Sequence, residues 1–172
     1  MKKIILAFVM LISIFACSGC SQVNQEVIRI HIRANSNNVE DQSIKLIVRD
    51  NIIEYITPLI SDCDSSVDVK NILQNNTENL TRIAENTLRE NGFEYGANAN
   101  ITCEYFPTRS YDGKVFDAGN YQALIINLGS GSGDNWWCVA YPPMCFVGVD
   151  NGTDNIEYRS KILELINKFF GK

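Results

Sequence analysis

Residues 129–147, GSGSGDNWWCVAYPPMCFV, constrain the fold of this chain more than any other stretch. They contain both tryptophans, two of the six cysteines and two of the four prolines. Neighbouring side chains of a strand face opposite ways, so Trp136 and Trp137 cannot both enter one core from a strand. We expect one indole in the core and the other near the surface or under a loop. The small residues 129–133 that precede them are interpreted as a flexible hinge.

Cys138 and Cys145 flank the Tyr141-Pro142-Pro143 bend of this stretch. Fully extended, the chain between the two cysteines would span about 23 Å, far more than a disulfide allows. The prolines can turn the chain back, and a cis bond before Pro142 would help to do so. We expect a Cys138–Cys145 disulfide, which would stabilise the fold by about 2–3 kcal/mol. The alternative is two buried free thiols beside an aromatic core.

The start of the chain is typical of an export signal. Two lysines precede the apolar run 4–16, which has the length of a signal's apolar region and is short for a membrane span. We therefore assign residues 1–19 to the signal and 20–26 to a short tether. Ser-Gly-Cys at the end of the signal resembles a lipoprotein cleavage site, which would make Cys20 the lipidated residue. Cleavage before Cys17, or cleavage without a lipid, are the alternatives.

Charge and cysteine spacing exclude several classes of function. Without the two signal lysines, 13 basic residues face 20 acidic ones, a net charge of −7. A chain with this charge is poorly suited to bind nucleic acid or an anionic lipid surface. We therefore expect membrane contact only through a lipid or an uncleaved signal. The four cysteines after Cys20 permit two bridges with three connectivities. With a single histidine and no zinc-type spacing, we expect no metal, no cofactor and no catalytic residue.

Residues 26–34, EVIRIHIRA, alternate strictly between apolar and polar side chains. This pattern predicts a half-buried strand with isoleucines on one face and Arg29, His31 and Arg33 on the other. The flanking arginines would disfavour protonation of His31. We interpret His31 as a structural hydrogen-bonding residue.

The remaining periodicity predicts an α+β fold. We expect a helix that is capped by Asn38 and stopped by Pro58. Its apolar stripe is expected to include Ile47 and Leu59, and an Asp41–Lys45 pair is expected outside the stripe. The other expected elements are a helix over about 67–91 ending at Gly92, strands over 100–107 and 121–128 joined through a small hairpin, and a closing helix over 156–170. The order β-α-α-β-β-α indicates a small antiparallel or mixed sheet packed with about three helices in a single domain, 27–172.

Three blocks of sequence resemble the stage II sporulation protein R family of endospore-forming bacteria. They are IRIHIRANSNNVEDQSIKLIVRD at 28–50, PTRSYDGKVFDAGNYQAL at 107–124 and NWWCVAYPPMCFV at 135–147. The third block is the most specific. Ser130 and Gly148 depart from the family pattern, which is expected to have acidic residues there.

The resemblance implies a signalling protein rather than an enzyme. Members of the family are made in the forespore and exported into the space between the forespore and mother-cell membranes. There they are thought to activate a membrane-embedded aspartic protease, which removes the pro-segment of the early mother-cell sigma factor. The partner implied for this chain is that protease, and no nucleic acid is involved.

Two sets of residues are candidates for contact with the protease. Aromatic side chains on a rigid loop make effective interface anchors. The first set is the exposed one of Trp136 and Trp137, with Tyr141 and Met144. The second set is His31, Asn35, Ser36, Lys45 and Arg49, for which local capping and surface pairing is the alternative.

Two other functions remain open from the residues alone. An exported or lipid-anchored envelope hydrolase would need a deep polar cleft around His31, with a cysteine or a carboxylate pair beside it. A lipoprotein that binds a small ligand would need an enclosed apolar pocket under the tryptophans.

Overall fold

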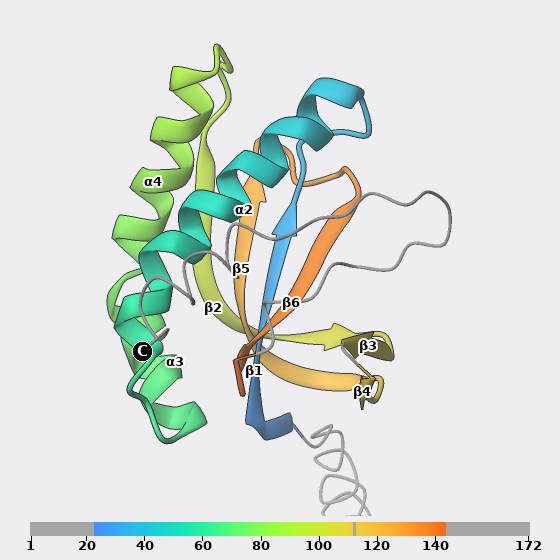
Figure 1. Ribbon diagram of the computed structural model, residues 1–172. Helices are drawn as coiled ribbons and strands as arrows, with labels where there is room; N and C mark the ends of the chain where they lie inside the picture. Colours follow the sequence, from blue (N-terminus) through green and yellow to red (C-terminus); the bar gives the residue numbers. More distant parts are fainter. Residues whose placement is uncertain (1–22, 112, 144–172) are drawn as a thin grey trace, which may run out of the picture.

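A computed structural model describes residues 23–111 and 113–143. Several sequence-based expectations lie outside the described residues: the export signal 1–19, Cys20, Met144, Cys145, Gly148 and the helix over 156–170. Within the described part, the protein is a single α+β domain with three helices and a mixed four-stranded sheet (Figure 1). The expected fold class is therefore confirmed.

The sheet has the strand order β2-β5-β1-β6. β1 runs parallel to β5 and antiparallel to β6, and β2 runs antiparallel to β5. The strands are β1 (Val23–Arg33), β2 (Ala97–Phe106), β5 (Gly119–Leu128) and β6 (Asn135–Tyr141). The expected hairpin between β2 and β5 is present as β3 (Arg109–Tyr111) paired with β4 (Lys114–Phe116). The tryptophan segment, to which the sequence pattern assigned no element, forms the edge strand β6.

Three helices cover one face of the sheet, and the β3–β4 hairpin lies beyond the other face near one end (Figure 1). The helices are α2 (Val39–Ile60), α3 (Ser66–Asn75) and α4 (Thr77–Glu90). We call the apolar cluster between the helices and the sheet the helix-side core; it includes Ile30, Ile32, Ile44, Val48, Leu80, Leu124 and Ile126. The hairpin-side core lies on the opposite face and consists of Val27, Phe106, Tyr111, Phe116, Tyr121, Ala123, Ile125 and Val139.

β1 is buried on both faces, although its alternation predicted one solvated face. Arg29 is 0% exposed and His31 1% exposed. The reason is tertiary: β1 lies between β5 and β6, and the hairpin-side core covers the face that carries these two polar side chains. Of the three polar side chains on this face, only Arg33, at the end of the strand, is partly exposed. The expectation of a half-buried strand was wrong for this reason.

α2 begins where the sequence predicts and ends later. Asn38 caps it, with its side-chain oxygen accepting from the Asp41 backbone N–H at 2.7 Å. Pro58 lies inside the last turn and does not stop the helix, which runs to Ile60. Ile47 is 43% and Leu59 37% exposed, so these two members of the predicted stripe lie outside the core.

The long helix predicted over 67–91 is two helices separated at Asn76. The Asn76 amide donates to the Ile72 carbonyl at 2.8 Å and accepts from the Tyr55 hydroxyl at 2.8 Å. Asparagine side chains compete with backbone groups in this way, which explains the break. At the end of α4, Gly92 has φ +82°, as expected for a helix stop.

The glycine-rich residues 129–133 are packed against the end of β1, which does not fit a flexible hinge. The Gly133 N–H donates to the Ala34 carbonyl at 2.9 Å. The hydroxyls of Ser130 and Ser132 both donate to the Asn35 carbonyl, at 2.7 and 2.8 Å. Gly133 is buried, and a Cβ added to it would overlap the Ser36 carbonyl oxygen.

Replacing Gly133 by alanine is expected to lower the free energy of unfolding by about 2–3 kcal/mol, because backbone must shift to admit the methyl group. Urea unfolding measures the loss. Gly119→Ala is the matched control, since its Cβ would lie 3.8 Å from the Tyr121 ring, an ordinary contact. Equal losses in the two variants would contradict the close approach of residue 133 to Ser36.

Candidate partner-binding surfaces

The two tryptophans point to opposite faces of the sheet, as expected for neighbours in a strand. In β6, Trp136 is in register with Ile32 of β1 and Trp137 with His31. Both indoles are half-buried, so the expectation of one indole in the core and the other near the surface was wrong. Trp136 packs against the helix-side core, and Trp137 packs against the hairpin-side core. Neither ring is fully enclosed, so each face of β6 presents part of an indole.

The candidate residues therefore separate into two clusters. We call the first the helix-side cluster; it consists of Asn35, Ser36, Asp41, Lys45, Arg49 and Trp136. We call the second the hairpin-side cluster; it consists of His31, Arg33, Glu104, Arg109 and Trp137. Tyr141 belongs to neither, because its hydroxyl donates to the Asp64 carbonyl at 2.7 Å and ties the end of β6 to the loop before α3. The peptide bond that follows Tyr141 is cis.

Asp41 is the centre of the helix-side cluster and is 2% exposed. Its carboxylate accepts hydrogen bonds from the Ser36 hydroxyl at 2.6 Å, the Asn35 amide at 3.0 Å and the Tyr95 hydroxyl at 2.6 Å. Burial acts to raise the pKa of Asp41, but the bonds from Ser36, Tyr95 and Asn35 outweigh it and hold the pKa below its usual value. Burial and the Asp41 bond raise the pKa of Tyr95 above its ordinary range.

Lys45 does not pair with Asp41, contrary to the expectation from their spacing. It is 5% exposed and donates to the Gln42 side chain at 2.6 Å and to the Asp134 carbonyl at 2.9 Å. Burial lowers the pKa of Lys45, and Asp134 opposes that effect. These bonds join the first turns of α2 to the loop before β6.

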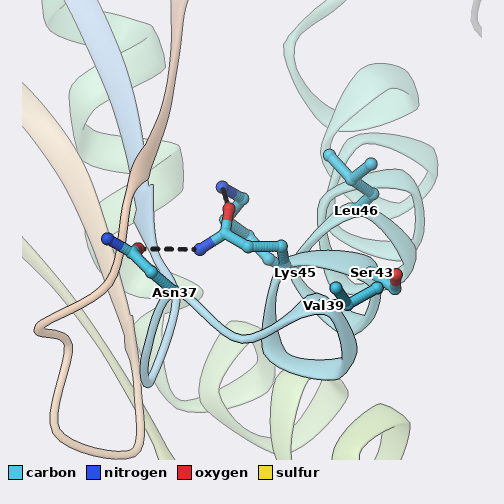
Figure 2. A pocket seen from close by; sticks show the side chains of 6 residues that line it. Asn37, Val39, Ser43, Lys45 and Leu46 are labelled. Atoms are coloured by element: carbon cyan, nitrogen blue, oxygen red, sulfur yellow. Dashed lines mark hydrogen bonds between the residues drawn. The ribbon is translucent and has the colours of Figure 1, made fainter.

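A hollow of about 300 Å³ lies beside Lys45. Figure 2 shows Asn37 facing the side chains that project from α2; its side-chain oxygen accepts from the Gln42 amide at 3.3 Å. The polar members Asn35, Ser36 and Lys45 thus bond within the chain, as the capping alternative predicts. Their contact with a partner stays a prediction.

Arg49 completes the helix-side cluster. Its guanidinium lies 5.6 Å from the centre of the Trp136 ring and pairs with the Asp50 carboxylate at 2.8 Å. Cys138 follows on β6 and is 2% exposed in the helix-side core. Among the described cysteines, Cys63, Cys103 and Cys138 form no bridge with one another. Because Cys145 lies outside the described residues, the Cys138–Cys145 disulfide stays a prediction.

His31 organises the hairpin-side cluster. Its ring stacks on Trp137 with centroids 3.8 Å apart, and its Nδ1 lies 3.1 Å from the Glu104 carboxylate. Burial lowers the pKa of His31 to about 4; Asn135 opposes this shift and Arg33 adds to it. The imidazole is therefore neutral at pH 7 and donates its Nδ1–H to Glu104.

Two arginines complete this surface. The other Glu104 oxygen pairs with Arg33, which also donates to the Asn127 side chain at 3.2 Å. The Arg109 guanidinium lies 5.8 Å from the Trp137 ring centre. The Arg109 Nε is buried and has no hydrogen-bond partner in the described structure. Trp137 is thus stacked on His31, and the Arg109 guanidinium lies near its ring.

Sequence reasoning missed Glu104 and Arg109 as members of this surface. Glu104 is separated from His31 by 73 positions, and β5 lies between their strands. No local pattern links the two residues. Arg109 lies within the second block of family resemblance, which is the one signal that could have drawn attention to it.

Within the described residues, the surroundings of His31 and the two hollows differ from what the envelope hydrolase and the ligand-binding lipoprotein would need. The hydrolase needed a deep polar cleft around His31, but His31 is 1% exposed. The lipoprotein needed an enclosed pocket under the tryptophans. Neither the hollow beside α2 nor a second hollow beside the hairpin is lined by His31 or by a tryptophan.

Within residues 23–111 and 113–143, no three His, Cys, Asp or Glu side chains are grouped so that they could hold a metal ion. The helices of this same region are either too short or too polar to cross a membrane.

The fold and its surfaces define an α+β domain in which a half-exposed tryptophan and arginines flank a buried, neutral histidine. A sequence model of the family described as stage II sporulation protein R (spore_II_R) matches residues 24–151. The chain therefore belongs to the stage II sporulation protein R family, as its three sequence blocks indicated.

A relative from Bacillus subtilis (strain 168), named stage II sporulation protein R, is 35% identical over 134 residues. The match covers 76% of this chain and 58% of the relative, so the chain spans less than two thirds of that protein's length. No solved structure matches the chain.

Proposed function

We propose that this protein is an exported signal of sporulation that activates a membrane-embedded aspartic protease and so triggers processing of the early mother-cell sigma factor precursor. The family match over residues 24–151 is the observation that carries this proposal. The protein acts from the space between the forespore and mother-cell membranes, free or held by a lipid on Cys20. It acts by binding, without catalysis or a cofactor of its own.

The hairpin-side cluster is the surface best suited to contact the protease. Interface hot spots are enriched in tryptophan and arginine, especially where the side chains are held in place before binding. Trp137 is stacked on His31, and Arg109 beside it has an unused Nε donor. The helix-side cluster suits this role less well, because Asn35 and Lys45 already bond within the chain.

The first experiment follows cleavage of the sigma factor precursor by immunoblot in sporulating cells that lack this gene. Uncleaved precursor is expected to accumulate, and an exported copy of the gene is expected to restore cleavage. Cleavage on schedule without the gene would contradict the proposed function.

Trp137→Ala is expected to weaken activation about tenfold or more, because it removes the central anchor of the surface. Restored cleavage is measured in the deletion strain, with the variant's level and melting temperature checked alongside. Tyr105→Ala is the matched control, since Tyr105 is a 62% exposed aromatic residue on β2. Arg109→Gln, which leaves His31 and Trp137 in place, is expected to reduce activation as well. Full activity of both Trp137→Ala and Arg109→Gln would exclude this surface.

A further inference from the structure

Arg29 is a buried cation without an acidic partner in the described structure. It is 0% exposed at the centre of β1. One terminal nitrogen, Nη2, donates to the Tyr111 hydroxyl at 3.2 Å. The other two nitrogens, Nε and Nη1, are buried and have no hydrogen-bond partner. Arginine stays protonated in proteins, so a positive charge with unused donors lies inside the domain.

Aromatic rings surround this guanidinium. The distances from Cζ to the ring centres are 4.7 Å for Phe106, 5.1 Å for Tyr121, 5.5 Å for Phe116 and 5.6 Å for Tyr111. Ring faces attract a cation, but they provide no acceptor for the Nε and Nη1 hydrogens. Burial without such acceptors is unfavourable, and hydrophobic replacement of buried ionic groups often stabilises proteins. The described residues therefore give no sufficient reason for a charge at this position.

A hollow of about 390 Å³ lies directly beside the aromatic cage. Phe116 and Tyr121 belong both to the cage and to the wall of the hollow, and Val27, two positions from Arg29, lines it as well. Arg29 itself does not line the hollow, so a group in the hollow would meet the guanidinium only after Phe116 or Tyr121 had moved. The hollow lies between the start of β1 and the β3–β4 hairpin, on the hairpin side of the sheet.

We propose that Arg29 is a carboxylate-binding residue and that this hollow admits an acidic side chain of the partner protein. The proposal rests on the proposed function only in assigning that side chain to the protease. A carboxylate matches a guanidinium because it accepts two parallel, charge-assisted hydrogen bonds at one fork. The guanidinium has two edges that can each donate two hydrogen bonds, one formed by Nε and Nη2 and the other by Nη1 and Nη2. Because only Nη2 bonds Tyr111, each edge keeps a donor without a partner in the described structure.

The charges at the rim do not prevent this interaction. Glu26, Asp117 and Lys114 line the hollow, and all three are exposed. Exposed charges act through water and are screened by salt, whereas a buried pair interacts about fourfold more strongly at an effective dielectric constant near 20. The attraction of Arg29 for a carboxylate within the cage therefore exceeds the repulsion from the two exposed acids.

The direct test observes the Arg29 Nε–H by NMR in the ¹⁵N-labelled full-length protein. Because this N–H is buried, its resonance is expected to exchange slowly with water and to be visible. The probes are an acetylated, amidated tetraglutamate peptide and the matching tetraglutamine peptide, with sodium acetate as a third arm. Tetraglutamate is expected to shift the resonance and the amides of Val27 and Lys114 saturably, at a Kd of about 1 mM.

Comparing tetraglutamate, tetraglutamine and acetate shows whether the site binds a carboxylate of a protein side chain or a free small carboxylate. Tetraglutamine is expected to bind at least tenfold more weakly. Equal shifts with both peptides, or none with either, would overturn the proposal. Saturation by acetate at lower concentration than by tetraglutamate would also overturn it, because the site would then take a free small carboxylate rather than a protein side chain.

Arg29→Met separates binding from stability. Methionine fills the cage without a charge, so the variant is expected to melt at or above the wild-type temperature while losing its response to tetraglutamate. A large loss of stability, equal to that of Ile30→Ala in the same strand, would show that Arg29 is a structural residue and would overturn the proposal. Arg29→Lys, which keeps the charge but loses the fork, is expected to bind tetraglutamate weakly.

Sporulating cells distinguish failure of this proposal from failure of the proposed function. A folded Arg29→Met protein that fails to restore sigma factor cleavage supports the acidic contact. Full cleavage with Arg29→Met, where the deletion strain shows none, overturns the Arg29 proposal and leaves the activator function intact. Normal cleavage in the deletion strain itself removes the activator function but leaves the NMR result to decide carboxylate binding.

Discussion

Replacing Asp41 by asparagine is expected to lower the free energy of unfolding by about 3–4 kcal/mol, because bonds to a charged acceptor contribute about 1.5–3 kcal/mol each. The carboxylate is 2% exposed and accepts from Ser36, Asn35 and Tyr95. An amide keeps the shape but turns an NH₂ group toward one of these donors. Urea unfolding at pH 7 measures the loss. It is a large fraction of the 5–15 kcal/mol that typical domains have.

Asp50→Asn is the matched control for this change. Asp50 lies on the same helix and pairs with Arg49, but its side chain is 36% exposed, so a loss below about 1 kcal/mol is expected. The pH dependence of the free energy of unfolding provides a second check. The folded pKa of Asp41 is below its unfolded value, so its stabilisation is present above about pH 4 and is lost as pH falls further. Similar losses in the two variants would show that the buried network contributes little.

Lowering the pH from about 6.5 to 4 is expected to remove about 3 kcal/mol of stability through His31 alone, since each pKa unit corresponds to 1.36 kcal/mol. The pKa of His31 falls from 6.5 to about 4 in the folded domain. Over this pH range the unfolded chain therefore binds a proton at His31 that the folded domain does not bind. As a result, the free energy of unfolding decreases as the pH falls. Other groups add their own dependence, so the comparison must be made with a variant.

His31→Gln supplies that comparison because it keeps a hydrogen-bond donor near Glu104 and does not titrate. The variant is expected to lose less stability than the wild type between pH 6.5 and 4. Since the chain contains one histidine, NMR of the His31 Cε1–H also reports its pKa directly. Parallel stability curves for the two proteins, or a midpoint near 6.5 in the NMR titration, would show that the ring is not buried as described.

Local chemistry in the sequence predicted several features of the fold correctly. Asn38 caps α2, Gly92 ends α4 with a positive φ, and the neighbouring indoles face opposite sides of β6. The small hairpin also lies where its turn residues indicated. Each of these depends on residues close together in the chain, where backbone geometry and hydrogen-bonding capacity act directly. The family membership was likewise readable from contiguous blocks.

The candidate site could be predicted only in part. Trp137 and His31 were named as candidates, but nothing in the sequence indicated that they stack or that Glu104 joins them. Asp41 and Lys45 have the spacing of a helical pair, yet each bonds to a different loop. Spacing on one helix establishes which residues can meet, and competing partners from other elements decide which of them do.

The sequence by itself determined the types of most elements, several caps and turns, and the family of this protein, because these depend on short-range chemistry. Only the tertiary structure decided that β1 is a central strand, parallel to β5 about a hundred residues away, and therefore buried on both faces. That placement encloses Arg29 among aromatic rings and keeps His31 neutral. An alternating pattern cannot reveal this, because the cover over its polar face comes from strands and a hairpin far along the chain.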